Sequence, residues 1–238
     1  MIIDEFLSIY KDDEHCQRQL IEQFLQATND IIELKELRDF VENNVFGFGE
    51  REFYAMHKMI VDSINKKEII FLEIGVFRGQ ILALYGILEN LCNKNIRIIG
   101  ISPLDSTDGH WESNYALDIS IIHDRFYLKH PELIVGLSTD DNVIEKVRLI
   151  PLDILYIDGG HTFDVVISDI KNYSPLVVPG GYLVIDDSAN NLKCCFNGKF
   201  WGISDVSNAV DSLLPPNTEN HKWQYIGNII HNRIWRRL

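Results

Sequence analysis

Five short apolar runs alternate with helix-length stretches between residues 69 and 186, and this alternation restricts the folds open to the chain. The runs occupy residues 69–74, 96–101, 133–137, 153–158 and 181–186. Such runs are typical of parallel strands buried on both faces, and the stretches 79–91, 115–127, 141–147 and 162–173 can form the crossover helices between them. We therefore predict an α/β fold with a Rossmann-like, doubly wound, mostly parallel sheet of about seven strands.

The C-terminal third allows one more helix and two extended segments. A helix is expected at 203–214, where Pro215 and Pro216 would end it. Extended segments near 223–230 and 231–238 can close the sheet as an antiparallel pair. The last residues also form a small basic patch, which we interpret as a solvated tail. It comprises Arg233, Trp235, Arg236, Arg237 and Leu238.

Residues 1–65 differ from the rest because their apolar residues recur at helical spacing. Leu20, Ile21 and Phe24 fall on one stripe, and residues 53–64 carry a second one. We predict a helical N-terminal extension, or lid, over residues 1–65. The ligand-binding domain would then occupy residues 66–238.

Charge and composition exclude several classes of partner. The chain of 238 residues has 35 acidic and 22 basic side chains, a formal net charge of -13. Such a surface repels phosphate backbones and anionic membranes, so neither nucleic acid nor membrane is expected as a partner. No apolar run reaches the roughly 18 residues of a membrane span, and the N-terminal stretch does not resemble a secretory signal. With no CxxC spacing among four cysteines, we expect a cytoplasmic protein.

The first apolar run ends in the pattern E-x-G-x-x-x-G, formed by Glu73, Gly75, Arg78 and Gly79. Glycine lets the backbone pass close to a ligand, and the following helix offers free amide groups to a ligand carboxylate. Glu73 can accept a hydrogen bond from a ligand ammonium group. A purely structural strand-to-helix turn is the alternative interpretation. The glycine spacing matches neither a dinucleotide site nor a phosphate loop.

The ends of the second and third runs carry weaker signals. An adenosine-binding protein usually has a carboxylate after the second strand to grip the ribose, but Ser102 stands there. Asp105 can reach back to the ribose, or it can be a turn-former after Pro103. After the third run, Asp140 can meet an adenine edge, although Ser-Thr-Asp-Asp at 138–141 is equally an ordinary helix cap.

The fourth and fifth runs both end in carboxylates, namely Asp158 and then the pair Asp186 and Asp187. Neighbouring parallel strands lie roughly 4.8 Å apart, so acids at equivalent strand ends can converge. Three crowded carboxylates repel one another unless a cation lies between them, and Mg²⁺ prefers such oxygen ligands. The alternative is that these acids cap the helices that follow.

His161 follows Asp158 by three residues, on the loop that leads into the next helix. An imidazole titrates near neutrality and can take the proton of an acceptor hydroxyl, although a histidine here can also be a cap or a packed ring. The remaining histidines considered lack such neighbours, and we interpret them as structural or surface residues. They are His110, His123, His130, His221 and His231.

Three blocks resemble, in order, motifs of class I S-adenosylmethionine-dependent methyltransferases. They read E-I-G-V-F-R-G-Q from residue 73, Y-I-D-G-G-H-T-F from residue 156 and P-G-G-Y-L-V-I-D-D from residue 179. More narrowly, they resemble the metal-dependent macrolide-sugar and rhamnosyl O-methyltransferases and the cephalosporin hydroxylase-like group. The resemblance spans about residues 68–190 and implies that residues 66–238 form the S-adenosylmethionine-binding methyltransferase domain.

The resemblance implies that Asp158, Asp186 and Asp187 bind Mg²⁺ and that His161 acts as the base. Ser102 departs from the family pattern, which leaves the ribose contact open. The residues expected to contact the cofactor are Glu73, Gly75, Arg78, Gly79, Ser102, Asp105, Asp140 and Asp158.

The expected activity is transfer of a methyl group from S-adenosylmethionine to a hydroxyl of a sugar or a glycosylated or polyhydroxylated small molecule. A catechol-type small-phenol O-methyltransferase and a non-catalytic S-adenosylmethionine-binding module are the alternatives. The helical extension and residues 190–205 can cover the site, where Phe196, Phe200 and Trp201 would stack on the acceptor or pack in the core. A homo-oligomer is compatible with the sequence.

Overall fold

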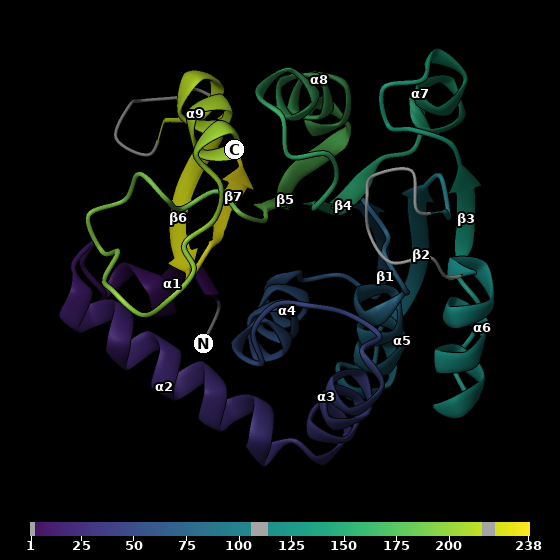
Figure 1. Cartoon of the computed structure of the whole chain (residues 1–238), viewed down its shortest axis with the longest axis horizontal. Coiled ribbons are helices and arrows are strands. Elements are labelled where there is room, and N and C mark those ends of the chain that lie inside the picture. The colour runs from purple at the N-terminus through teal and green to yellow at the C-terminus, as the bar shows by residue number, and fades with distance from the viewer. Residues whose placement is uncertain (1–2, 106–113, 216–221) are drawn as a thin grey trace.

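The computed structural model describes residues 3–105, 114–215 and 222–238 and contains one seven-stranded sheet flanked by helices on both faces (Figure 1). The strand order is β3-β2-β1-β4-β5-β7-β6, and among these strands β7 alone runs opposite to the rest. The strands are β1 (Glu68–Ile74), β2 (Asn95–Ser102), β3 (Glu132–Val135), β4 (Leu152–Ile157), β5 (Val177–Ile185), β6 (Trp223–Ile229) and β7 (Asn232–Arg237). The predicted Rossmann-like, mostly parallel sheet with a final antiparallel pair is confirmed.

The helices form two layers, one on each side of the sheet (Figure 1). The layer with α4, α5 and α6 also carries α2 and α3 on its outside, while α7, α8 and α9 cover the opposite face. The bounds are α1 (Ile3–Ser8), α2 (Glu14–Asp30), α3 (Ile32–Asn44), α4 (Glu52–Ser63), α5 (Gln80–Leu91), α6 (Tyr115–Arg125), α7 (Asp141–Val147), α8 (Phe163–Tyr173), a 3₁₀ turn (Ser174–Leu176) and α9 (Ser204–Leu213). Within the described residues, none of these helices is both long and apolar enough to cross a lipid bilayer.

Alternating strand residues supply two separate hydrophobic cores. In β1, Phe71 packs in the cluster under α1–α6, whereas Leu72 belongs to the cluster under α7–α9. In β4, Tyr156 belongs to the cluster under α1–α6 and Ile157 to the cluster under α7–α9. Because side chains alternate along a strand, Glu73 shares the face of Phe71 and lies on the side of the N-terminal helices.

The N-terminal helices share the hydrophobic core on one face of the sheet. Ile3, Leu34 and Met56 are fully buried in the same hydrophobic cluster as Phe71, and the Tyr182 hydroxyl of β5 donates to Asp4 Oδ1 at 2.7 Å. The expected helical segments correspond to α2, α3 and α4, whereas α1 was not anticipated because its six residues are too few to show a period. The division into an extension over 1–65 and a domain over 66–238 stays a prediction.

The C-terminal basic patch is not a solvated tail, and that interpretation is wrong. Strand β7 lies between β5 and β6, so Arg233 and Trp235 are almost fully buried. The guanidinium Nη1 of Arg233 donates to Asp211 Oδ1 of α9 at 2.5 Å, and that of Arg236 donates to Asp4 Oδ2 at 2.9 Å. The basic residues suggested a solvated tail, but β7 is paired on both sides in the sheet. Arg233 and Arg236 form ion pairs with Asp211 and Asp4.

We expect Trp235→Ala to lower the free energy of unfolding by about 3–5 kcal/mol, because it removes a large ring from the core under α8 and α9. Leu238→Ala is the matched control, since Leu238 is 61% exposed, and it should change stability by less than about 0.5 kcal/mol. Urea denaturation measures both values. Equal effects of the two substitutions would contradict a buried C-terminal strand.

Candidate active site

A cavity of about 740 Å³ lies beyond the carboxyl ends of β1, β4 and β5. Its wall includes the turn after β1, residues 102–105 after β2, residues 158–162 after β4 and the acid pair after β5. The α3–α4 segment and the C-terminal part contribute residues from outside the parallel strands. The cavity thus lies next to the β1/β4 switch point of the sheet, where open α/β folds bind ligands.

Gly75 brings the ends of β1 and β4 into direct backbone contact. Its φ of +96° lies in the left-handed region, and a Cβ at this position would come within 1.9 Å of the Asp158 carbonyl oxygen. A residue with a side chain would therefore push the loop after β4 away from the turn after β1. The neighbouring Gly79, with φ +90°, is the N-cap of α5, and it also lines the cavity.

Arg78 ties this turn to two other segments rather than projecting freely. Its Nε donates to Asp118 Oδ2 of α6 at 2.6 Å, and its Nη1 donates to the Val45 carbonyl at 2.5 Å. These bonds hold the loop before α4 over the glycine turn. The expected cofactor contact of Arg78 stays a prediction.

Glu73 presents a buried carboxyl group to the cavity. Within the described residues its Oε2 has no hydrogen-bond partner, and the side chain lines the cavity wall. Burial, helped by the negative charge of Asp158, raises the pKa of Glu73 well above its usual range. A cationic group bound beside it would relieve this penalty, as the predicted ammonium contact requires.

Of the three residues expected near the nucleoside part of a ligand, two line the cavity and one does not. Ser102 and Asp105 both line the cavity, and the Ser102 hydroxyl accepts from the Leu104 amide at 3.0 Å. Asp140 is not among the lining residues; it occupies the N-cap position of α7, and its Oδ2 accepts from the Leu137 amide at 3.0 Å. The structure thus brings Ser102 and Asp105 to the site, but not Asp140.

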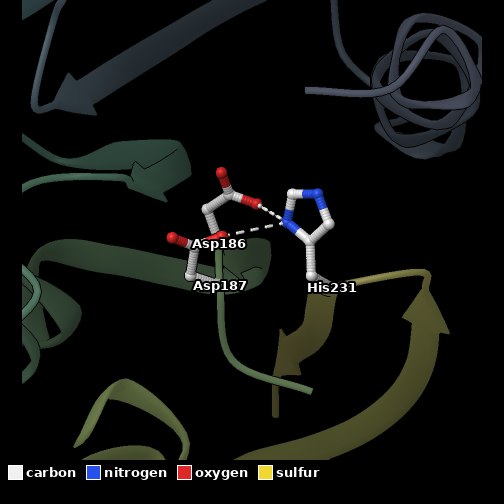
Figure 2. Close-up of side chains that lie close together, drawn as sticks. All are labelled: Asp186, Asp187 and His231. Atoms are coloured by element: carbon white, nitrogen blue, oxygen red, sulfur yellow. Dashed lines mark hydrogen bonds and ion pairs between the residues drawn. The ribbon is translucent and has the colours of Figure 1, made fainter. Parts of the chain in front are cut away.

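Asp186 and Asp187 meet His231, which lies in the turn between β6 and β7 (Figure 2). His231 Nδ1 lies 2.7 Å from Asp186 Oδ1 and 3.2 Å from Asp187 Oδ1. Asn232 Nδ2 donates to the same Asp186 oxygen at 2.6 Å. One potential ligand atom from each of Asp186, Asp187 and His231 lies within 4.8 Å of the others.

His231 is therefore not a surface residue, and the expectation that it lacks acidic neighbours is wrong. No motif around His231 indicates a contact with the acid pair, because Asp186 lies 45 residues away in the sequence. The signal that could have found it is the predicted antiparallel strand pair. Strand β7 pairs with β5 so that Ile185 faces Arg233, which brings the residue before β7 next to the residues after β5. His110 and His221 lie outside the described residues.

Electrostatics distinguish the members of this cluster. Burial opposes protonation of His231, but the charges of Asp186 and Asp187 outweigh it and raise its pKa to about 10. Burial likewise opposes ionisation of Asp186, but the charge and hydrogen bond of His231 hold the pKa of Asp186 below its ordinary value. Asp158 lacks such a partner, so burial and repulsion from Asp186 and Asp187 raise its pKa well above the usual range.

His161 lies between the two groups of acids. Its Nε2 is 3.4 Å from Asp187 Oδ2 and 4.0 Å from Asp158 Oδ1, and within the described residues it makes no hydrogen bond. The four expected residues thus line one end of the cavity. Asp158 lies beside the close group of Asp186, Asp187 and His231 rather than within it, and its role as a metal ligand stays a prediction.

Two segments outside the parallel strands contribute to the cavity wall. Residues 46–49 are held by Arg38, whose guanidinium donates to the carbonyls of Phe48 and Gly49 at 3.2 and 2.6 Å. Residues 190–205 contribute Phe200, and Lys199 Nζ pairs with Glu50 Oε2 at 3.1 Å and so links this segment to the loop before α4. Both segments that were expected to cover the site line it.

Comparison with known proteins agrees with this geometry. Residues 72–188 match a family described as a methyltransferase domain. This stretch is a methyltransferase domain. Its matched range begins in β1 and ends just after Asp187, so it includes the glycine turn, the loop with His161 and the acid pair.

One relative and two solved structures extend the comparison. The chain is 29% identical over 150 residues to the uncharacterized protein R132 of Acanthamoeba polyphaga mimivirus, covering 62% of this chain but only 64% of that protein. CalS11, a TDP-rhamnose 3'-O-methyltransferase of calicheamicin biosynthesis, matches with TM-score 0.53 and 13% identity over 97% of this chain and 98% of its own. MycE of the mycinamycin pathway, solved with Mg, S-adenosylhomocysteine (SAH) and mycinamycin VI, matches with TM-score 0.51 and 18% identity over 85% of this chain and 52% of its own. At these identities, the solved structures establish a shared fold.

We expect Gly75→Ala to destabilise the methyltransferase domain more than Gly180→Ala. Both glycines have positive φ, but a Cβ at Gly180 meets nothing within 4 Å, so Gly180→Ala should cost only about 1 kcal/mol of backbone strain. Gly75→Ala adds a clash with the Asp158 carbonyl, worth about a further 1–3 kcal/mol. Urea denaturation compares the two. Similar losses would mean that the β1–β4 contact tolerates a side chain.

The pKa of His231 predicts how the stability of the protein depends on pH. Because folding raises this pKa from about 6.5 to about 10, the stabilisation is fully present below pH 6.5 and is lost as the pH rises toward 10. In a chelator, the wild type should therefore lose its advantage in unfolding free energy over His231→Gln across this range. A difference between the two proteins that is independent of pH would contradict a protonated His231.

Proposed function

We propose that the chain is an S-adenosylmethionine-dependent O-methyltransferase that uses Mg²⁺ and acts on a hydroxyl of a sugar or another polyhydroxylated small molecule. One observation carries this proposal. The imidazole of His161, with a buried Nε2 that makes no hydrogen bond within the described residues, faces Asp187 and Asp158 in the same cavity as the Glu73–Gly75 turn.

The cofactor would lie along the ends of β1 and β2. The Glu73 carboxyl would accept a hydrogen bond from the ammonium group of its methionine part, because its Oε2 is buried without a hydrogen-bond partner among the described residues. The α5 amides after Gly79 can receive the ligand's carboxylate. Asp105, which lines the cavity beyond β2, would take the ribose contact that Ser102 lacks a carboxylate to make.

The donor set fits a divalent cation. Asp158, Asp186 and Asp187 offer the carboxylate oxygens that Mg²⁺ prefers. Burial and the charges of Asp186 and Asp187 raise the pKa of Asp158, and a bound cation would offset this cost of ionisation. When bound, the ion would lower the pKa of an acceptor hydroxyl. His231 and Asn232 both hold Asp186 Oδ1, and they fix the orientation of that carboxylate.

His161 would act as the base of the reaction. A hydroxyl beside its Nε2 would give up its proton to that nitrogen, and the oxygen would then take the methyl group in line from the sulfonium sulfur, so that SAH leaves as a neutral thioether. The cover formed by residues 46–49 and 190–205 would exclude water and orient the two reactants. The names of CalS11 and MycE, a sugar methyltransferase and an enzyme solved with Mg and a macrolide, support the choice of acceptor and ion.

Calorimetric titration with SAH, with and without Mg²⁺, followed by a methyl-transfer screen of glycosides and phenols, tests the proposed function. We expect SAH binding, Mg²⁺-stimulated turnover, and a loss of kcat of about 10²–10⁴-fold in His161→Gln without loss of SAH affinity. His130→Gln is the control, because His130 is exposed and pairs with Asp124 away from the cavity.

Three results would count against the proposal. SAH binding without any turnover would favour the non-catalytic module, and preference for catechols over glycosides would favour the phenol methyltransferase. Equal activity of His161→Gln and His130→Gln would remove His161 as the base.

A further inference from the structure

Asp186 and Asp187 are consecutive in the sequence, yet both line the cavity. Successive side chains of an extended strand point to opposite faces of the sheet, so two neighbouring carboxylates can face one site only if the chain leaves the extended conformation. It does so at Asp187, whose φ of +53° lies in the left-handed region. As a result, an oxygen of each carboxylate lies close to the same nitrogen of His231 (Figure 2).

The left-handed conformation of Asp187 is supported by its neighbours in the chain. Aspartate adopts this conformation more readily than most residues, but it is uncommon outside glycine and persists where the surrounding structure holds it. Before Asp187, the Asp186 amide donates to the Ile157 carbonyl of β4 at 2.9 Å. After it, the Ser188 amide donates to the His231 carbonyl at 2.9 Å. The residues on both sides of Asp187 are therefore fixed, one to β4 and one to the turn before β7.

A loop formed by residues 188–203 returns to Asp187 and holds its carbonyl group. The loop closes through an antiparallel bridge between Ser188 and Gly202, and the amide of Ile203 donates to the Asp187 carbonyl at 2.8 Å. Gly202 has a φ of +105°, and a Cβ at this position would overlap the carbonyl carbon and oxygen of Asp187. Glycine is therefore required where the loop closes against Asp187.

The same loop is anchored to the N-terminal part of the chain. The amide of Cys194 donates to Asp12 Oδ1 at 3.1 Å. The guanidinium carbon of Arg18 lies 3.7 Å from the centroid of the Phe196 ring. These contacts restrain the loop on the side away from the acid pair, so that it cannot move freely away from Asp187.

We propose that the loop 188–203 positions the second carboxylate of the cation site, and that Gly202 is the positioning residue through which it acts. This inference rests on the proposed function and deepens its metal site. Gly202 does not line the cavity. By packing against the Asp187 carbonyl, it keeps the backbone turn that directs the Asp187 carboxylate to the same side as that of Asp186. A side chain at Gly202 would displace this turn and separate the two carboxylates.

Titration of the full chain with Mn²⁺, followed by electron paramagnetic resonance, tests the inference. Mn²⁺ serves as the probe of the cation site, and SAH affinity measured without the ion reports that each variant is folded. Gly202→Ala should weaken Mn²⁺ binding by about 10–100-fold, the loss typical when a residue that supports a metal ligand is changed. Its SAH affinity should match that of the wild type, because Gly202 lies outside the cavity lining.

Gly198→Ala is the matched control. Gly198 belongs to the same loop and has a φ of +91°, but a Cβ there meets nothing within 4 Å among the described residues. This substitution imposes the same kind of backbone strain without touching Asp187, so its Mn²⁺ affinity should equal that of the wild type. Equal Mn²⁺ affinities in Gly202→Ala and Gly198→Ala would overturn the inference.

A double-mutant cycle with Asp187→Asn separates positioning from a general structural defect. Asparagine keeps the shape of the side chain and tolerates the left-handed conformation, but it lacks the charge. Because Gly202 acts through Asp187, Gly202→Ala should weaken Mn²⁺ binding little further in the Asp187→Asn background. Fully additive losses would contradict the proposed role.

An ester in place of the peptide bond between Gly202 and Ile203 is the second variant, and it decides the matter if Gly202→Ala does not fold. It removes the amide that donates to Asp187 and adds no side chain. We expect Mn²⁺ binding to weaken by about three- to ten-fold, and unchanged affinity would overturn the inference. A wild type that binds SAH but no Mn²⁺ would overturn the metal dependence of the proposed function and this inference with it.

Discussion

The close approach of β1 and β4 at Gly75 determines where every other part of the site lies. Because Gly75 has no Cβ, the Asp158 carbonyl can lie against it, and the amide of Asp158 donates to the Ile74 carbonyl at 2.8 Å. The turn that carries Glu73 and the loop that carries His161 therefore open into the same cavity. The proposed methyl donor and the proposed base can work on one acceptor only because these two backbones touch.

Concentrated negative charge is the second feature that organises the site. A buried acid pair such as Asp186 and Asp187 is costly unless it is compensated, and His231 supplies that compensation from the turn before β7, the strand next to β5. Asp158 lies beside this ion cluster without an equivalent partner. The same arrangement favours a bound metal ion, which would offset the cost of ionising Asp158.

The sequence was sufficient to predict the parallel strands and crossover helices, because these segments are apolar on both faces or periodic along one. The helix expected at 141–147, for example, is α7. The convergence of Asp158, His161 and the acid pair also followed from strand ends alone. His231 and the buried Arg233 could not be read in this way, because their environment depends on which strand β7 pairs with. Asp140 shows that an acid near a strand end need not belong to the ligand site, because its carboxylate accepts a hydrogen bond from the Leu137 amide in its own turn.

The insertion of β7 between β5 and β6 has a consequence for the order in which the chain can assemble. The central sheet can form from residues already present in β1 to β5, but β6 cannot join it at the edge, because its neighbour in the sheet comes later in the chain. Strand β7 must pair with β5 before β6 can be part of the sheet, so β6 and β7 add to the sheet together as a hairpin. His231 reaches the acid pair when this hairpin pairs with β5, so closure of the sheet also brings charge compensation to the carboxyl ends of the parallel strands.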